Sequence, residues 1–173
     1  QATLQAIHAL VLSAESALHE SVTAVGIGHP GSANPLDGRI RNANSTCLNG
    51  QTLQTDLQAL LVRPVKLAND ADCLALSEAT DGIAKNDPTV FGVILGTGVG
   101  GGWVINGRLL QGPNGLAGEW GHNPLPISFA DELPAPACYC GKHGCIEAWL
   151  TGPPHIAHYQ KRTPEKSITH VPA

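Results

Sequence analysis

Three cysteines and one histidine constrain this sequence more than any other feature. The cysteines lie within eight residues, and the histidine precedes the first of them by sixteen residues. Three thiolates and one imidazole form the Cys₃His donor set of a tetrahedral structural zinc site. The sequence therefore predicts a zinc site, and its expected ligands are His122, Cys138, Cys140 and Cys145. Two carboxylates, Glu119 and Glu147, flank these ligands, which predicts that the metal also shapes a functional pocket.

Other interpretations of this segment stay open. His143 lies between the last two cysteines and competes with His122 for the fourth position. The Cys138-x-Cys140 spacing is tighter than the Cys-x₂₋₄-Cys of zinc fingers, which weakens that label but not metal binding. A disulfide is the poorer interpretation, because these two cysteines are too close to pair comfortably and a third thiol would be left over.

The composition is typical of an α/β protein with many close backbone approaches. Charged residues make up 14% of the 173 residues, and there are 20 glycines. A net charge of −4 argues against a general nucleic-acid binder, and no apolar run approaches the roughly 20 residues of a membrane span. Five cysteines, three of them at metal-ligand spacing, favour a reduced cytoplasm. Cys47 and Cys73 are then interpreted as a loop thiol and a core residue.

Hydrophobic periodicity and turn residues predict alternating helices and strands. The expected helices span residues 3–20, 53–61 and 69–84, and the expected strands span residues 22–28, 65–68, 90–95 and 103–105. Residues 42–50 are expected to form a loop. A domain boundary is expected near residue 87, and residues 162–173 are expected to be mobile because their periodicity is weak.

A run of five glycines within seven residues follows the expected strand 90–95. Successive glycines let backbone N–H groups turn toward one concavity, which is how a nest binds phosphate oxygens. Thr97 adds a hydroxyl donor. The run lacks the lysine of a P-loop, and strand-like residues follow it where a nucleotide fingerprint requires a helix. A glycine-rich β-hairpin turn is the alternative interpretation.

Two further clusters of polar residues are candidates for chemistry. Asn69 and Asp70 lie at a strand-to-helix junction, where both residue types are favoured as helix caps. A third acid at Asp72 exceeds what capping needs, so Asp70 is a candidate catalytic group and Asp72 a first-turn acid. Glu119 and His122 would share one face of a helical turn. Flanking glycines favour a pocket group and a metal ligand over a surface polar cluster.

With these motifs in place, the chain resembles the ROK family of repressors, unassigned reading frames and sugar kinases. The resemblance runs from about residue 22 to residue 152 and is carried by residues 26–31, 69–70, 95–102, 119–122 and 138–147. Residues 42–50 and 118–126 are similar to the bacterial fructokinase branch. A branch that phosphorylates N-acetylglucosamine stays open, as does glucokinase.

The resemblance implies an α/β fold of the actin-like, ribonuclease-H-like type, with two lobes and with sugar and ATP in the cleft. Residues 1–86 would be the remainder of the N-terminal lobe, with the catalytic aspartate on the sugar side. Residues 87–173 would begin the C-terminal lobe, with the phosphate loop and the zinc motif. The Asp-x-Gly-Gly-Thr loop that opens the family's first lobe does not occur here. We therefore expect an internal fragment, incomplete at both ends, with weak or no kinase activity by itself.

The resemblance also implies a reaction and a role for individual residues. The reaction would be transfer of the γ-phosphate of ATP, accompanied by Mg²⁺, to the 6-hydroxyl of a hexose, and most directly of fructose. Asp70 would take the proton from that hydroxyl, and the other hydroxyls would be bound by Asn69, Glu119, His122 and Glu147. The ATP phosphates would be faced by Gly96, Thr97, Gly98 and Gly100. Zinc would be bound by His122, Cys138, Cys140 and Cys145.

Three further expectations concern partners, location and alternatives. A homodimer is expected of the full-length parent, and a cytoplasmic location is expected for the reaction. A sugar-sensing transcriptional repressor of the same family is one alternative to the kinase. A non-catalytic remnant that binds zinc and sugar is the other.

Overall fold

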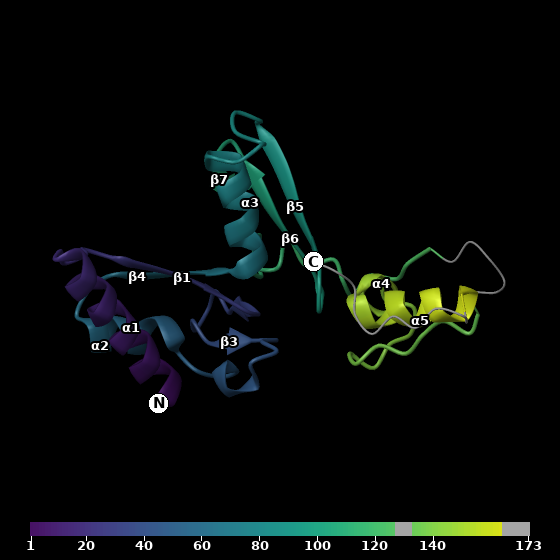
Figure 1. Cartoon of the computed structure of the whole chain (residues 1–173), viewed down its shortest axis with the longest axis horizontal. Helices are drawn as coiled ribbons and strands as arrows, with labels where there is room; N and C mark the ends of the chain where they lie inside the picture. The colour runs from purple at the N-terminus through teal and green to yellow at the C-terminus, as the bar shows by residue number, and fades with distance from the viewer. Residues whose placement is uncertain (127–132, 164–173) are drawn as a thin grey trace. The chain divides into compact units, whose positions relative to one another are not determined.

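The computed structural model describes residues 1–126 and 133–163 (Figure 1). The chain divides into two compact units. Unit 1 contains residues 1–73 and 111–117, and unit 2 contains the rest. The division falls inside helix α3 (Asp70–Thr80), between Cys73 and Leu74. The predicted lobes, 1–86 and 87–173, follow the family pattern and stay a prediction. The predicted mobility of residues 162–173 falls almost wholly outside the described residues.

Unit 1 is built around two parallel strands. Strand β1 (Val25–His29) pairs with β4 (Val65–Asn69), with Val25 opposite Val65 and His29 opposite Asn69. A parallel pair requires a crossover, and this one contains β2 (Ser32–Ala33), β3 (Ile40–Arg41), a 3₁₀ turn at Thr46–Leu48 and helix α2 (Leu53–Leu61). Helix α1 (Ala2–Leu18) packs against α2, and Figure 1 shows the two helices next to each other.

The core of unit 1 depends on the leucines of α2. Leu53, Leu57 and Leu61 recur every four residues, so they share one face of the helix, and all three are buried. Ile40, Ala43 and Val65 complete the buried cluster, and α1 packs Leu4, Ile7 and Val11 against it. Leu10 and Leu18 of the predicted apolar stripe in α1 are instead 70% and 65% exposed. The stripe therefore faces the core only in part.

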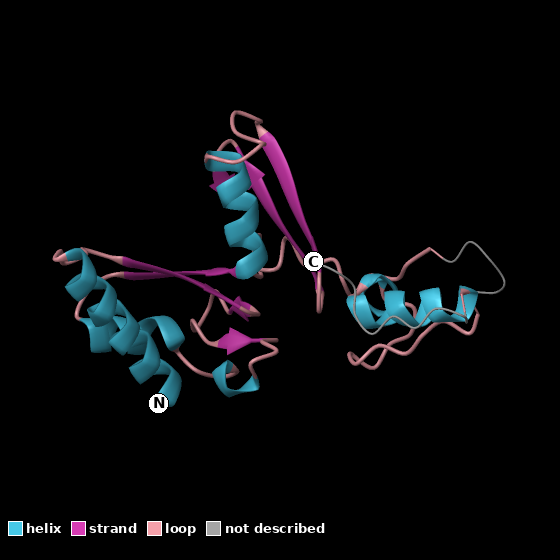
Figure 2. Ribbon diagram, in the orientation of Figure 1, coloured by secondary structure: helices cyan, strands magenta, loops and turns pink. Residues whose placement is uncertain are grey.

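Unit 2 is built around an antiparallel hairpin that Figure 2 shows beside α3. Strand β5 (Thr89–Leu95) pairs with β6 (Val99–Ile105), which pairs with β7 (Arg108–Leu109). Gly92 allows α3 to approach β5, because a Cβ atom there would lie 2.9 Å from the Cβ of Ala75. Helices α4 (Ile146–Leu150) and α5 (Gly152–Arg162) follow.

The structure confirms the predicted helices and strands but moves several of their ends. The strand predicted at 103–105 begins at Val99, because glycines that suggested a loop are paired with β5. Helix α3 ends at Thr80 instead of residue 84, where Asp81 and Gly82 form a turn on the carbonyl of Ser77. The pattern did not predict α5, although two prolines in its first turn are typical of a helix start. No helix among residues 1–126 and 133–163 is long and apolar enough to cross a bilayer.

Replacement of Leu57 by alanine is expected to destabilise unit 1 by about 2–5 kcal/mol, because the side chain is fully buried and the cavity cannot collapse completely. All tryptophans and tyrosines lie beyond residue 73, so unfolding is best measured by far-UV circular dichroism in denaturant. Leu10→Ala is the matched control at an exposed position, and we expect a far smaller change. Equal losses in the two variants would contradict this account of the core.

Candidate functional site

The predicted catalytic residue lies where β4 ends and α3 begins. Asn69 Oδ1 accepts the Ala71 N–H at 2.8 Å, and Asn69 Nδ2 donates to the Gly31 carbonyl at 2.9 Å. Asn69 therefore caps the helix, as its residue type predicts. The exposed Asp70 carboxylate accepts the same Ala71 N–H through Oδ1 at 3.0 Å. This bond uses one of the two carboxylate oxygens.

Two titratable residues accompany this junction. His29 ends β1 opposite Asn69, is 4% exposed, and donates from Nδ1 to the Pro30 carbonyl at 2.8 Å. Burial raises the pKa of the Asp72 carboxyl, the charge of Asp70 raises it further, and His29 opposes both effects. His29 was not predicted from the sequence, because a single histidine at a strand end carries no spacing signal.

The glycine run divides between a turn and a strand. Gly96, Thr97 and Gly98 are exposed and connect β5 to β6, with the Gly96 N–H donating to the Gly98 carbonyl at 3.0 Å. The observed geometry is thus a glycine-rich hairpin turn. Gly100 lies in β6 opposite Ile94, and its carbonyl accepts the Trp120 indole N–H at 2.8 Å. A phosphate-binding role for these residues stays a prediction.

The four predicted metal ligands come together in unit 2. One ligand atom from each of His122, Cys138, Cys140 and Cys145 lies within 4.8 Å of the others. Cys140 Sγ is 3.7 Å from Cys145 Sγ, and Cys138 Sγ is 3.6 Å from His122 Nδ1. A tetrahedron with Zn–S bonds of about 2.3 Å has edges of about 3.8 Å, so this group fits a four-coordinate ion. His143 is outside it, and all five cysteines are free thiols.

Backbone pairing holds the ligand segments together. Residues 121–125 run beside residues 144–147, with a bridge between Pro124 and Cys145 and an N–H of Leu125 donating to the Gly144 carbonyl at 2.8 Å. Gly141 and Gly144 adopt φ values of 86° and 72°, which side-chain-bearing residues rarely reach. The glycines of the cysteine segment therefore form the turns that return the third thiol to the other two.

The thiols differ in acidity. A backbone hydrogen bond from Lys142 is the main effect that lowers the pKa of Cys140. Burial is the main effect that raises the pKa of Cys145 to about 11. Metal binding requires thiolates and displaces their protons, so an ion bound here would displace the proton of Cys145.

Glu147 connects this group to the glycine turn. Its side chain is 9% exposed, and its Oε2 accepts the Val99 N–H at 3.0 Å. Cβ atoms at Gly98 and Gly121 would lie 3.3 and 3.1 Å from that oxygen. The carboxylate therefore fits only because both neighbouring positions are glycine.

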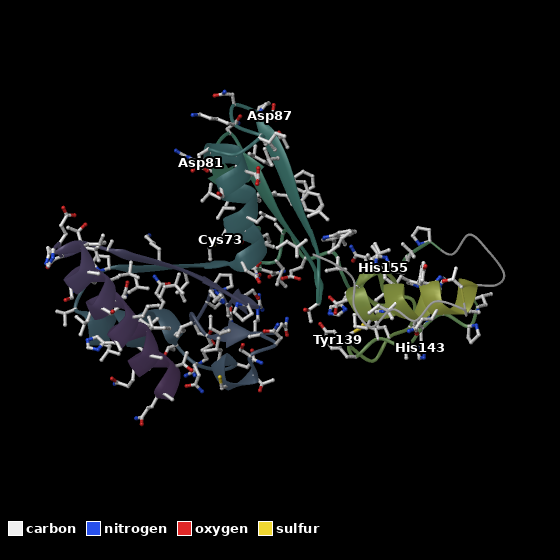
Figure 3. All side chains as sticks on the ribbon, in the orientation of Figure 1. Cys73, Asp81, Asp87, Tyr139, His143 and His155 are labelled. Atoms are coloured by element: carbon white, nitrogen blue, oxygen red, sulfur yellow. The ribbon has the colours of Figure 1, made fainter. Side chains whose placement is uncertain are left out.

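Tyr139 is a site residue that the sequence analysis missed. Its Oη lies 3.2 Å from His122 Nε2, and the two rings meet edge to face at 5.2 Å. Loss of hydration at the hydroxyl, followed by the interaction with the Glu147 carboxylate, raises the pKa of Tyr139 to about 12, although most of the residue is exposed. Figure 3 shows Tyr139 and His143 on the segment before α4. The position of Tyr139 between Cys138 and Cys140 was the sequence signal that could have indicated it.

The predicted site residues thus fall into two groups. Unit 2 brings together the metal-ligand group, Glu147 and the glycine turn, and it also contains the exposed Glu119. Asn69 and Asp70 belong to unit 1.

Replacement of Asp72 by asparagine is expected to stabilise the protein at neutral pH, because the folded-state pKa is raised and ionisation of this carboxyl therefore costs stability. The cost grows as pH rises through the window between the ordinary and the raised pKa, and it is absent below the ordinary value. We expect a gain of less than about 1 kcal/mol at about pH 7, since solvent screens a half-buried carboxylate. The gain should vanish at about pH 3, below the ordinary pKa of the carboxyl.

Denaturant unfolding at the two pH values measures this difference. Asp87→Asn, at an exposed position, is the matched control and should change stability little. A gain for Asp72→Asn that is equal at both pH values would contradict the electrostatic explanation.

Comparisons with known proteins agree with one another. A family model described as the ROK family matches residues 1–171. The N-acetyl-D-glucosamine kinase of Yersinia enterocolitica is 45% identical over 153 residues, which cover 86% of this chain and 50% of that protein. The chain spans about half the length of the curated relatives it matches.

Two solved structures are similar along almost the whole chain. A ROK hexokinase from Thermus thermophilus matches with a TM-score of 0.76 and 31% identity, over 95% of this chain and 53% of that one. A ROK-family transcriptional regulator, a homologue of the E. coli MLC protein, matches with a TM-score of 0.78 and 25% identity, over 96% and 40%. The protein therefore belongs to the ROK family and has its actin-like α/β fold.

Proposed function

We propose that this protein is an ATP-dependent hexose kinase. The observation that carries the proposal is the position of Glu147. Its carboxylate lies 3.0 Å from the backbone nitrogen of Val99, next to the turn that we assign to the ATP phosphates. It also bonds Tyr139, which contacts His122, a residue that we assign to the sugar. Phosphoryl transfer needs the acceptor hydroxyl and the terminal phosphate in contact, and this neighbourhood offers groups for both.

Phosphoryl transfer requires mainly that the protein position the reactants and supply one weak base. Asp70 takes the proton of the 6-hydroxyl as the oxygen attacks the γ-phosphorus, and ADP leaves as the bond between the γ-phosphorus and the β,γ-bridging oxygen breaks. Asn69, Glu119, His122 and Glu147 bind the remaining hydroxyls. A buried acceptor that loses its hydroxyl partner is costly, which gives selectivity among sugars. The exposed turn Gly96–Thr97–Gly98 faces the phosphates. Mg²⁺ neutralises phosphate charge when it is bound with the nucleotide, and we assign no side chain to it.

Zinc is the ion that best fits the ligand group of unit 2. Three thiolates and an imidazole at tetrahedral separations suit Zn²⁺ over oxygen-preferring Mg²⁺ or Ca²⁺. Four protein ligands close the coordination sphere, so the ion supplies orientation and no reaction chemistry. His122 would bind it through Nδ1, and Nε2 would then face a hydroxyl.

N-acetylglucosamine is our first candidate substrate, and fructose is the second. The support for the first is the similarity to the N-acetyl-D-glucosamine kinases of Yersinia, which are 45–47% identical over most of this chain. The support for fructose is the similarity of residues 42–50 and 118–126 to the fructokinase branch. The reduced thiols favour a cytoplasmic reaction, and the homodimer stays a prediction.

A sugar-sensing regulator is the second candidate function, favoured by the similarity to the solved ROK-family regulator. A sensor needs the sugar and zinc groups but neither a base at Asp70 nor a phosphate turn. The two functions therefore differ in turnover. A kinase releases ADP when sugar is added, whereas a sensor binds sugar without consuming ATP.

Replacement of Asp70 by asparagine is expected to lower turnover by about 10²–10⁴-fold, because the base is removed while shape is kept. Sugar affinity should stay within about threefold, because the hydroxyl-binding residues are unchanged. Coupled ADP release measures turnover in a form of the protein that spans the whole length of the family's kinases, since this chain spans about half of the curated relatives. Calorimetric binding measures affinity separately, and both use N-acetylglucosamine, fructose, glucose and mannose. Asp87→Asn is the control. Near-normal turnover of Asp70→Asn would refute the base, and a protein that binds no hexose and releases no ADP would refute the proposed function.

Replacement of Cys140 by serine is expected to lower the zinc content at least about tenfold, because a ligand thiolate is lost from a closed site. The wild type should contain about one zinc per chain. Cys140 and Cys47 are both exposed, so Cys47→Ser is a matched control that should retain the metal. Metal analysis of freshly purified protein decides the question, and equal zinc in both variants would rule out this ligand set. A chelator should also lower the thermal stability of the wild type.

A further inference from the structure

The hydroxyl of Tyr139 lies between two groups that the proposed kinase uses to bind sugar. Tyr139 Oη is 3.2 Å from His122 Nε2. The Glu147 carboxylate also interacts with this hydroxyl and helps to raise its pKa. Because His122 Nδ1 faces Cys138 Sγ at 3.6 Å, the ring proton of a metal-bound His122 lies on Nε2. His122 then donates to Tyr139 Oη, and the Tyr139 hydroxyl donates to Glu147.

A sugar hydroxyl at this place would make the same two bonds. It would accept from His122 Nε2–H and donate to a carboxylate oxygen of Glu147, since a hydroxyl is one donor and two acceptors, as a phenol is. Glu147 keeps acceptor capacity beside its Oε2 bond to the Val99 N–H, whereas His122 Nε2 has a single hydrogen to donate. One hydroxyl at a time can therefore satisfy both His122 and Glu147 with good geometry.

The Tyr139 side chain can move away from His122 with little loss of apolar contact. Its side chain is 83% exposed, so its ring has little apolar contact to lose. The edge-to-face contact with His122 is worth about 0.5–1.5 kcal/mol at most. The hydroxyl is thus the part of Tyr139 that is held, and the rest of the side chain can swing into solvent.

We propose that the Tyr139 hydroxyl competes with a substrate hydroxyl for His122 and Glu147, and that sugar binding displaces it. This inference rests on the proposed sugar-binding role of the two residues. Tyr139 makes the pocket selective, because a ligand must replace both bonds of the tyrosine to gain affinity. A sugar with no hydroxyl at this position leaves Tyr139 in place and binds more weakly.

Replacement of Tyr139 by phenylalanine removes the competing hydroxyl and keeps the exposed ring. We expect sugar affinity to rise by about two- to tenfold, the range set by one net hydrogen bond. The measurement is calorimetric titration of the protein with N-acetylglucosamine and fructose. Zinc content and thermal stability serve as controls for folding. Tyr159→Phe, the only other tyrosine in the sequence, is the matched control and should leave affinity unchanged.

A second measurement uses the wild type and does not depend on the folding of a variant. With ring-labelled tyrosine the NMR spectrum contains two tyrosine signals, which the two phenylalanine variants assign. Saturating sugar should move the Tyr139 signal toward that of a solvated tyrosine and leave the Tyr159 signal in place.

The outcomes separate the two proposals. Weaker or equal sugar binding by Tyr139→Phe, or an unmoved Tyr139 signal at saturation, overturns the competition while sugar binding itself stands. A wild type that binds neither sugar refutes the proposed function, and the competition falls with it.

Discussion

The hydrogen bond from the Val99 N–H to Glu147 Oε2 is the interaction on which unit 2 depends. A carboxylate that is 9% exposed needs partners to offset its lost hydration, and this bond joins α4 to the start of β6 at 3.0 Å. The Thr151 N–H donates to the Glu147 carbonyl at 3.4 Å, and the Gly152 N–H donates to the Gly96 carbonyl at 3.2 Å. The glycine turn is thereby held at both ends by the segment that begins with the third cysteine.

Several glycines of this unit are required because a side chain would clash with neighbouring atoms, and not because the backbone must be flexible. Gly98 and Gly121 leave room for the Glu147 carboxylate, and a Cβ atom at Gly118 would lie 1.9 Å from the Gly101 carbonyl oxygen. The run at 96–102 therefore has two uses along its length. Its first three residues form an exposed turn, and its last three lie in β6, where close backbone approach is required.

The sequence predicted the elements whose signal is local. Helix α2 has the predicted bounds, because leucines every four residues mark one buried face. The metal-ligand group was predicted because residue type and spacing specify it. The start of β6 at Val99 was not predicted, because glycines in a sequence indicate a loop unless the partner strand is known. Tyr139 and His29 were missed for the same reason, because their partners lie at distant or uninformative positions in the sequence.

Capping and catalysis at the start of α3 are compatible, and the geometry limits how. Asn69 Oδ1 is bound to the Ala71 N–H, and one Nδ2 hydrogen is bound to the Gly31 carbonyl. A side-chain amide has two donor hydrogens, so Asn69 can offer a sugar one donor while its oxygen caps the helix. Asp70 has one oxygen on the same N–H and one available to accept a proton. The cap therefore fixes both side chains. Asn69 retains a donor N–H and Asp70 an acceptor oxygen, and the proposed sugar hydroxyl can bond to either kind of group.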